Sequence, residues 1–476
     1  MGKEIAITRF TAEDFLRARE RLAAETKLLG EELAAGKFSA GDYVAGFELE
    51  AWIIDRNYYP APINEPLFER VASALVVPEL SRFNIEVNGA SQHLSGRALS
   101  VLHAELEATW KRCLEAANEL EAWPIVIGIL PTIAEKDLCL ANMSPRNRFF
   151  ALNQQVLKQR HGEPLHIHIE GHERLELDHR DVMLEAATTS FQLHLQVPAD
   201  RVPRYYNASV IAAAPLVAAS ANSPFLFGRA LWEKTRIPLF EQAIEIGGYG
   251  GLEGSEVRRV TLGTGYLKDS AFEPFVENLN TYPVLLPTQL EEPARHYPHL
   301  RLHNGTIWRW VRPLVGFGED GTRHIRIEQR VIPSGPTLVD QMANAALYYG
   351  LARHLADLPQ APERALPFKQ ARENFYAAAT HGLEAELVWL DGHRIPATTL
   401  LLEELVPRAH EGLLRFGLER ADAERYLGIL AARVRTGQTG AAWQRAHAER
   451  HGRDFLKLTA DYLHHQRRGE PVHEKV

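Results

Sequence analysis

Four segments of the sequence alternate between apolar and polar residues, and each keeps its polar face for an unusual set of side chains. Successive side chains of a β-strand point to opposite sides of the sheet, so residue parity separates the two faces. The apolar faces would pack on helices. The polar faces carry Glu48 and Glu50; Arg82, Asn84, Glu86 and Asn88; Ser190, Gln192, His194 and Gln196; and His324, Arg326, Glu328 and Arg330.

The alternative explanation is a sheet with one face in water, which is common in antiparallel sheets. For any single strand the two explanations are about equally good. A solvated face would more often carry Lys, Thr and Ser, whereas lysine is absent from all four polar faces. The composition of the whole set therefore favours a binding surface.

The acidic residues of this surface have the chemistry of ligands for hard cations. Carboxylates two residues apart on a strand lie roughly 6.5–7 Å apart, and like charges so placed repel each other unless a cation holds them. Mg²⁺ and Mn²⁺ prefer oxygen ligands. The candidate carboxylates are Glu48, Glu50, Glu86 and Glu328.

Basic residues on the same strand patterns are suited to phosphate. His194 is a borderline metal ligand or a phosphate donor, and Arg312 and Arg330 are fork-shaped donors for phosphate or carboxylate oxygens. A surface on which acidic residues bind metal ions and neighbouring arginines bind phosphates is suited to phosphoryl transfer. The sequence contains no GxxxxGK[ST] loop, so a nucleotide would be held through its metals and side chains.

The chain order of the patterns predicts a mixed portion followed by a helical one. We expect helices over residues 11–36, 99–123 and 336–357, and strands over residues 41–55, 81–89, 189–197, 303–313 and 323–335. A glycine-rich segment, residues 247–265, is expected to be a lid, a substrate loop or a plain disordered loop. The stretch PQAPERALP at 359–367 predicts a boundary between a catalytic domain, residues 1–358, and a helical portion, residues 359–476, that packs on it.

Charge and cysteine content exclude several classes of protein. Lys and Arg number 53 against 61 Asp and Glu, a net charge of −8, which gives no footprint for nucleic acid or an anionic membrane. Cys113 and Cys139 form neither a disulfide framework nor a Cys-x-x-Cys motif. The segment MGKEIAITRF lacks an apolar signal core, and no stretch reaches the ~18 apolar residues of a membrane helix. We therefore expect a cytoplasmic protein.

Six ordered motifs over residues 43–355 resemble the type 2 glutamate–cysteine ligase family, which consists of carboxylate–amine ligases with a glutamine synthetase-like fold. The motifs are GFELE, RFNIEVN, SFQLHLQV, ANSPF followed by WEKTR, HNGTIWRWVRP and IEQRVIPSGPTLVD. The resemblance implies an α+β fold in which a curved antiparallel sheet forms an open cradle with flanking helices. It also implies an ATP-driven reaction with Mg²⁺ or Mn²⁺, in which a carboxylate becomes an acyl phosphate and an amine then forms an amide or γ-glutamyl bond.

Residue by residue, the resemblance implies roles for most of the polar face. Glu48, Glu50, Glu86, His194 and Glu328 match metal-binding positions, and Arg330 matches an arginine near the transferred phosphate, with Arg312 as a second catalytic arginine. The implied nucleotide-binding residues are His194, Gln192 and Arg330. The implied substrate-binding residues are Arg236, Asn88 and Trp310. The substrates implied are a small amino acid or other carboxylate and an amine. Residues that would select glutamate or cysteine cannot be placed, so substrate identity stays open.

Several alternatives remain at this stage. A metal-dependent amide hydrolase could use the same acids to activate water, and a relative that binds ligand without turnover is a third possibility.

His166, His168 and Glu170, with His172 nearby, form either a transition-metal site or an ordinary surface strand. HAERH at 447–451 fails the HExxH motif and indicates an exposed helix face. Trp308 and Trp310 share the parity of Arg312 and either wall the pocket, stack on a base or belong to the core. The sequence does not indicate an oligomeric state.

Overall fold

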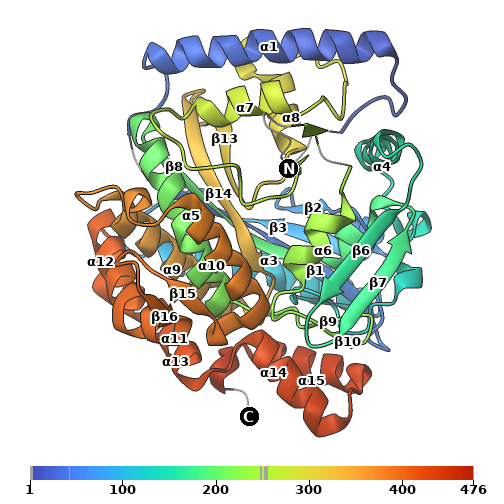
Figure 1. The fold of residues 1–476 in the computed structure, drawn as a ribbon. Helices are drawn as coiled ribbons and strands as arrows, with labels where there is room; N and C mark the ends of the chain where they lie inside the picture. The colour runs from blue at the N-terminus through green and yellow to red at the C-terminus, as the bar shows by residue number, and fades with distance from the viewer. Residues whose placement is uncertain (1–3, 42, 247–248, 251–255, 475–476) are drawn as a thin grey trace.

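An eight-stranded antiparallel sheet forms the centre of the computed structural model, which describes residues 4–41, 43–246, 249–250 and 256–474. Its main strands run in the order β13-β14-β8-β1-β3-β2, and β4 and β5 also pair with β1. The strands are β1 (Val44–Asp55), β2 (Val76–Pro78), β3 (Asn84–Asn88), β4 (Gln92–His93), β5 (Ala122–Ile125), β8 (Ser190–Val197), β13 (Val311–Phe317) and β14 (Arg323–Pro333). The curled sheet and its helices confirm the expected α+β cradle (Figure 1).

The strand register brings the polar residues of different strands onto one face. Glu50 pairs with Glu86 across β1 and β3, and Glu48 pairs with Gln192 across β1 and β8. Glu328 lies opposite His194 on one side and Arg312 on the other. The register between β14 and β8 shifts between Gln329 and Ile332. This bulge lies at Arg330, and bulges of this kind re-aim side chains at the rims of sites.

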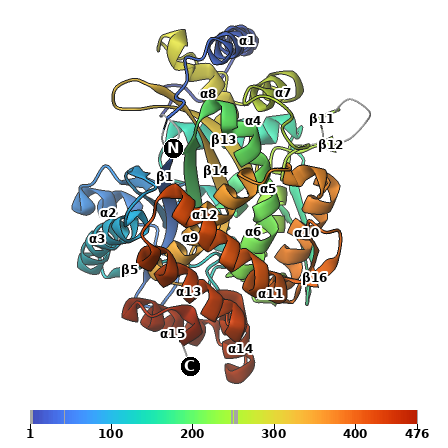
Figure 2. The same ribbon diagram turned by 90° about the vertical axis from the view of Figure 1, so that its left-hand side faces the viewer.

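Helices α5 (Val202–Ala219) and α9 (Leu338–Ala356) lie against each other and against the apolar side of the sheet, and nearly all of their residues are buried. Helices α12 (Val406–Phe416) and α13 (Arg420–Thr436) cover α9 in turn (Figure 2). α12 and α9 approach closely where Gly412 faces Gly350, because a Cβ atom at residue 350 would lie 2.2 Å from the carbonyl oxygen of Ala409. The C-terminal helices therefore share the core of the sheet domain.

The C-terminal portion is not wholly helical, which corrects the sequence-based expectation. It contains α10 (Phe368–His381), α11 (Ala397–Leu400), α12, α13, α14 (Gly440–His451) and α15 (Phe455–Arg468). Between α10 and α11 lies a hairpin of β15 (Glu386–Val388) and β16 (Arg394–Pro396). Its turn contains Gly392 with φ +78°, a conformation that glycine adopts without strain. The proposed domain boundary at 359–367 stays a prediction.

Other helices lie over the polar side of the sheet. α1 (Ala12–Ala34), the helix expected over residues 11–36, begins with a capping box of Thr11 and Asp14 and runs across α7 (Glu273–Thr281) and α8 (Pro298–Gly305) (Figure 1). The long helix expected over 99–123 is α3 (Ala98–Glu119), which contacts α9 and α13 on the apolar side of the sheet. Further elements are α2 (Asn64–Val71), α4 (Asn147–Gln159), α6 (Arg236–Ala243) and the short strands β9 (Phe225–Leu226) and β10 (Arg229–Ala230). Strands β6 (Leu165–Glu170) and β7 (Arg174–His179) form a separate hairpin.

The expected strand over residues 303–313 is wrong in its first half. α8 continues to Gly305, and β13 starts only at Val311. The guanidinium Nη1 of Arg312 lies 3.3–3.4 Å from the carbonyl oxygens of Asn304, Gly305 and Ile307, which holds the connecting turn against the sheet.

In the glycine-rich segment, residues 247–248 and 251–255 lie outside the described residues, and β11 (Tyr249–Gly250) pairs with β12 (Glu256–Val257). In the described part of the chain, no helix has both the length and the apolar composition of a membrane span.

Candidate active site

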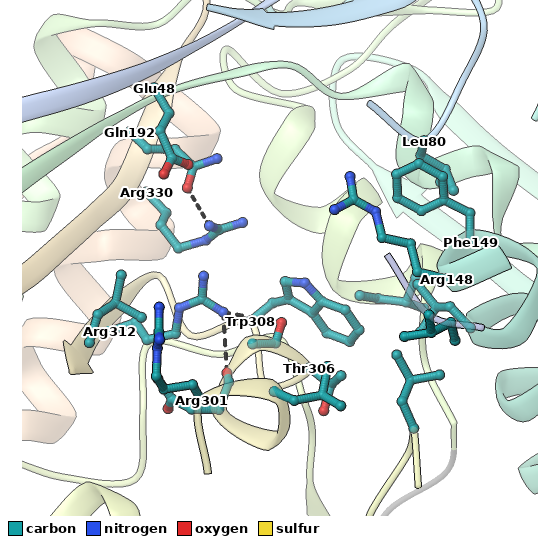
Figure 3. A pocket seen from close by; sticks show the side chains of 18 of the residues that line it. Glu48, Leu80, Arg148, Phe149, Gln192, Arg301, Thr306, Trp308, Arg312 and Arg330 are labelled. Carbon is teal, nitrogen blue, oxygen red and sulfur yellow. Dashed lines mark hydrogen bonds between the residues drawn. The ribbon is translucent and has the colours of Figure 1, made fainter. Parts of the chain in front are cut away.

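A cavity of about 560 Å³ lies over the polar face of the sheet, a volume typical of small-molecule sites. Figure 3 shows Glu48, Gln192 and Arg330 on one side of it and Leu80, Arg148 and Phe149 on the other. The sheet side is formed by Glu48, Glu50, Gln192, Arg312, Arg326 and Arg330, and much of the opposite side is apolar. Trp308 also lines the cavity.

Side chains from three strands, all of types that bind metals, come together at the buried edge of this cavity. Glu48 on β1, His194 on β8 and Glu328 on β14 each offer a ligand atom, and these atoms lie within 4.8 Å of one another. His194 Nε2 is 3.3 Å from Glu48 Oε1 and 3.9 Å from Glu328 Oε1. Burial would raise the pKa of Glu48, but its electrostatic interaction and hydrogen bond with His194 outweigh burial and lower the pKa.

Two arginines neutralise Glu328. Arg312 forms a two-pronged ion pair with it, Nε to Oε2 at 2.8 Å and Nη2 to Oε1 at 3.2 Å. Arg330 Nη1 lies 3.3 Å from Oε2 and also donates to Gln192 Oε1. Burial alone would raise the pKa of Glu328, but the charges of Arg312 and Arg330 outweigh it and hold the pKa well below its usual range.

A second group consists of acids alone. Glu50, Glu79 and Glu86 offer carboxylate oxygens within 4.8 Å of one another. Burial and the charge of Glu48 raise the pKa of Glu86 to about 7, and burial and the charge of Glu86 raise the pKa of Glu79 well above its usual range. Asn88 Nδ2 donates to Glu86 Oε1 at 2.9 Å. Without a cation, such a group keeps protons on its carboxyl groups.

Glu50 is held by β8. The backbone N–H of Ser190 donates to its Oε2 at 2.6 Å, and Gln192 Nε2 donates to its Oε1 at 2.9 Å. Burial raises the pKa of Glu50 despite the opposing charge of Arg236. Gln192 therefore links Glu50 to Arg330, since its amide nitrogen faces the acid and its oxygen faces the arginine.

These residues fit a hard divalent cation by their chemistry. Five carboxylates form the two groups, and three of them, Glu48, Glu50 and Glu79, line the cavity. Glu48 Oε2 is buried with no hydrogen-bond partner among the described residues. Oxygen donors of this kind are the ligands that Mg²⁺ and Mn²⁺ take. His194 fits less directly, because Arg326 Nε donates to its Nδ1 at 2.8 Å and thereby places the proton of the neutral ring on Nε2.

None of the three residues expected to bind substrate lies in the cavity lining. Asn88 is hydrogen-bonded to Glu86, and the other two lie behind the lining. Trp310 is fully buried, and its Nε1 donates to Glu241 Oε1 at 2.8 Å. Arg236 is also buried, donates from Nη1 to the carbonyl oxygen of Arg330 at 3.1 Å, and lies with Cζ 5.1 Å from the Trp310 ring. Burial lowers the pKa of Arg236 to about 10. These positions favour a supporting role for Arg236 and a core role for Trp310.

Two acids of the cavity were not found from the sequence. Glu79 follows the three-residue strand β2, and Glu185 lies in the 3₁₀ segment Val182–Ala187. Burial and the charge of Glu50 raise the pKa of Glu185 to about 8. Glu79 has the same residue parity as Val77, and the structure pairs Val77 with Glu86. Parity could therefore have placed Glu79 on the polar face, once the pairing of β2 with β3 was known. Glu185 had no such signal, because only the tertiary fold brings it to the sheet.

The other histidine groups lie away from the cavity lining. His166 and His168 lie on the β6–β7 hairpin, as the sequence indicated. His447 and His451 lie on α14, where His447 is buried and Nε2 is 2.8 Å from Asp461 Oδ2, while His451 is exposed. Cys113 is buried in α3, where burial raises the pKa of its thiol to about 12.

Comparisons with known proteins agree on one family and fold. The family model of glutamate–cysteine ligase family 2 (GCS2) matches residues 44–460. A glutamate–cysteine ligase (GshA) from Francisella tularensis, solved in complex with AMP, superposes with a TM-score of 0.53 at 13% identity and covers 90% of each chain. A bifunctional glutathione synthetase from Pasteurella multocida superposes with a TM-score of 0.53 at 11% identity, over 92% of this chain and 54% of the other. A search of curated proteins found no match.

Proposed function

Since the chain belongs to glutamate–cysteine ligase family 2, we propose that it is an ATP-dependent carboxylate–amine ligase that forms an amide or γ-glutamyl bond through an acyl phosphate. The observation that carries the proposal is the placement of two groups of acids and two arginines on one side of a single cavity. The similar fold of a glutamate–cysteine ligase solved with AMP supports the use of a nucleotide.

Glu48 and Glu328, with Glu50, Glu79 and Glu86, would hold Mg²⁺ or Mn²⁺. A cation bound there neutralises the charge of the ATP phosphates. Because two arginines already neutralise Glu328, Glu48 is the more accessible ligand of its group. His194 would serve the nucleotide end as a hydrogen-bond donor from Nε2, in line with the proton placement that Arg326 imposes.

In the first step, a carboxylate oxygen of the substrate attacks the γ-phosphorus of ATP, and ADP leaves. Arg312 and Arg330 line the cavity and supply fixed positive charge for the phosphoryl oxygens. Gln192 keeps Arg330 in place because it accepts a hydrogen bond from Nη1. Fixed donors of this kind need no rearrangement as charge develops.

In the second step, the amine nitrogen attacks the acyl carbon, and inorganic phosphate leaves. An ammonium substrate must first lose a proton. Glu185 lines the cavity and its ionised form could accept that proton; because its pKa is raised to about 8, the ionised share is small at pH 7 and increases as the pH rises through 8. The net result is one amide bond, ADP and phosphate.

A metal-dependent amide hydrolase is the second candidate, because acids of this kind also activate water on a metal. The arginines at the cavity favour the ligase, since hydrolysis of an amide has no phosphate to bind. Dependence on ATP distinguishes the two. A relative that binds nucleotide without turnover would form no product in either assay.

The test is phosphate release from Mg-ATP by the purified protein, with amino acids, other carboxylates and amines supplied singly and in pairs. The ligase requires both partners and yields a product equal to their summed mass less one water, which mass spectrometry identifies. Amide cleavage without ATP would establish the hydrolase instead. We further propose that the substrates are small molecules and that the protein acts in the cytoplasm, where its free cysteines stay reduced.

A further inference from the structure

We propose that the β6–β7 hairpin carries a transition-metal site, separate from the cavity, for an ion of the Zn²⁺ class. The site consists of His166 and His168 on β6 and Glu176 on β7, and Asp178 on β7 orients His166. We call these four residues the hairpin cluster. The hairpin lies beside α6 and away from α12 and α13 (Figure 1). The proposal does not depend on the proposed ligase activity.

The register of the hairpin gathers the four side chains on one face. His166 pairs with Asp178 and His168 pairs with Glu176, so all four residues point to the same side. The opposite side carries Leu165, Ile167 and Ile169, which are buried. Ligand atoms of His166, His168 and Glu176 lie within 4.8 Å of one another. The cluster is open to solvent, so an ion can reach it without any opening of the fold.

Asp178 fixes which nitrogen of His166 is available. Its Oδ1 lies 2.8 Å from Nδ1 of His166, which places the ring proton on Nδ1 and leaves the Nε2 lone pair facing Glu176. A carboxylate that accepts the second ring N–H is the usual partner of a metal-binding histidine. An ordinary surface ion pair requires no such arrangement around the opposite nitrogen.

The spacing of the ligand atoms also matches a metal. Two ligands at about 2.1 Å from a tetrahedral zinc ion lie about 3.4 Å apart, and His166 Nε2 is 3.8 Å from Glu176 Oε1. Arg174 Nη2 binds the other oxygen of Glu176, Oε2, and so leaves Oε1 for the histidine side. Two imidazoles and one carboxylate, with water as the fourth ligand, form a coordination set that Zn²⁺ accepts.

The hairpin is tied to the cavity side of the protein. The backbone N–H of His168 donates to Gln242 Oε1 at 2.7 Å, and Trp232 Nε1 donates to the carbonyl oxygen of Glu170 at 2.6 Å. Gln242 belongs to α6, the helix that begins at Arg236. A bound ion would link β6 to β7 and make this support of α6 more rigid.

The experiment is a Zn²⁺ titration of the full chain, without a histidine tag, against a chelating dye. Millimolar Mg²⁺ is present throughout to occupy the acids of the cavity. We expect one equivalent of zinc that competes with the dye. His166→Asn and His168→Asn should each lose this equivalent, and Asp178→Asn should weaken the affinity about 10- to 100-fold.

Two matched controls keep the result specific. His172→Asn removes an exposed histidine from the turn of the same hairpin, and His451→Asn removes the exposed histidine of the α14 group; both should retain the zinc equivalent. Wild-type protein that takes up no zinc, or a His166→Asn variant with unchanged zinc binding, would overturn the proposal. Full affinity in Asp178→Asn would overturn the assignment of Nε2 as the ligand atom. Circular dichroism checks that each variant is folded.

Discussion

Substitution of Glu48 by glutamine is the sharpest test of the candidate active site. Glu48 has one ionic partner, His194 at 3.3 Å, and its Oε2 is buried with no hydrogen-bond partner among the described residues. Glutamine keeps the shape of the side chain and removes its charge. The change therefore removes a cation ligand and leaves the neighbouring residues almost undisturbed.

The expected effects on activity and stability differ in size. Residues that only orient a metal ligand cost about 10- to 100-fold when they are lost, so loss of a ligand itself should lower turnover at least about 100-fold, or about 2.7 kcal/mol of transition-state stabilisation. The free energy of unfolding should change by no more than about 1 kcal/mol, because a neutral His194 ring leaves no buried charge uncompensated when Glu48 becomes glutamine.

Glu328→Gln is the contrasting variant. Glu328 neutralises two buried arginines, Arg312 and Arg330. Removal of one partner from a buried ion pair costs about 3–5 kcal/mol, because the other charge is left uncompensated. We therefore expect Glu328→Gln to lose both activity and stability, whereas Glu48→Gln loses activity alone.

The assay measures ATP-dependent product formation over a series of Mg²⁺ and Mn²⁺ concentrations, together with chemical denaturation of each variant. Glu48→Gln should need more metal, or fail to reach wild-type turnover at any concentration. Wild-type turnover and wild-type metal dependence in Glu48→Gln would refute the metal assignment. A loss of several kcal/mol in this variant would instead refute our account of its surroundings.

Three further predictions concern stability. Burial raises the pKa of Glu241 to about 7, so its contribution to stability is fully present below about pH 4.5 and is lost as the pH rises through 7. The loss amounts to about 3 kcal/mol, and Glu241→Gln should flatten this part of the stability–pH curve; an unchanged curve contradicts the assignment. Arg433 is buried against Asp340 at 2.8 Å, so Arg433→Met should cost about 3–5 kcal/mol in denaturation experiments, and a loss below 1 kcal/mol would show that the C-terminal helices contribute little to the core. Thr11→Ala removes the N-cap of α1, and its free energy of unfolding should fall by about 1 kcal/mol. The control is Thr436→Ala, which changes the exposed last residue of a different helix, α13.

The polar face of the sheet was predictable because side-chain alternation is a local property. Parity along each strand already separated Glu48 and Glu50 from Leu49, and Gln192 and His194 from Leu193. The register that pairs Glu328 with His194 depends on contacts between distant segments, and no sequence pattern in one strand encodes it. The resemblance to a ligase family placed these strands together, and the family and the fold are confirmed.

Residues outside the strands were harder to predict for the same reason. Glu185 reaches the cavity from a 3₁₀ segment, where it has no alternating neighbours. The expected strand over 303–313 misplaced Trp310, because apolar residues in a buried turn mimic the alternation of a strand. The structure places Trp308 in the cavity lining and Trp310 in the core, although both share one parity.

One face of the sheet thus gives the same residue type two electrostatic environments. At the β14 end, Glu328 lies against Arg312 and Arg330, and net positive charge remains there to meet a phosphate. At the β3 end, Glu50, Glu79 and Glu86 offer oxygen ligands close together, and a cation that displaces their protons would restore their negative charge. A metal-bound nucleotide carries both kinds of charge along its length: the phosphates are negative and the bound cation is positive. A curved sheet can bind such a ligand along its strand order, because neighbouring strands lie about 4.8 Å apart and each adds one charged group to the row.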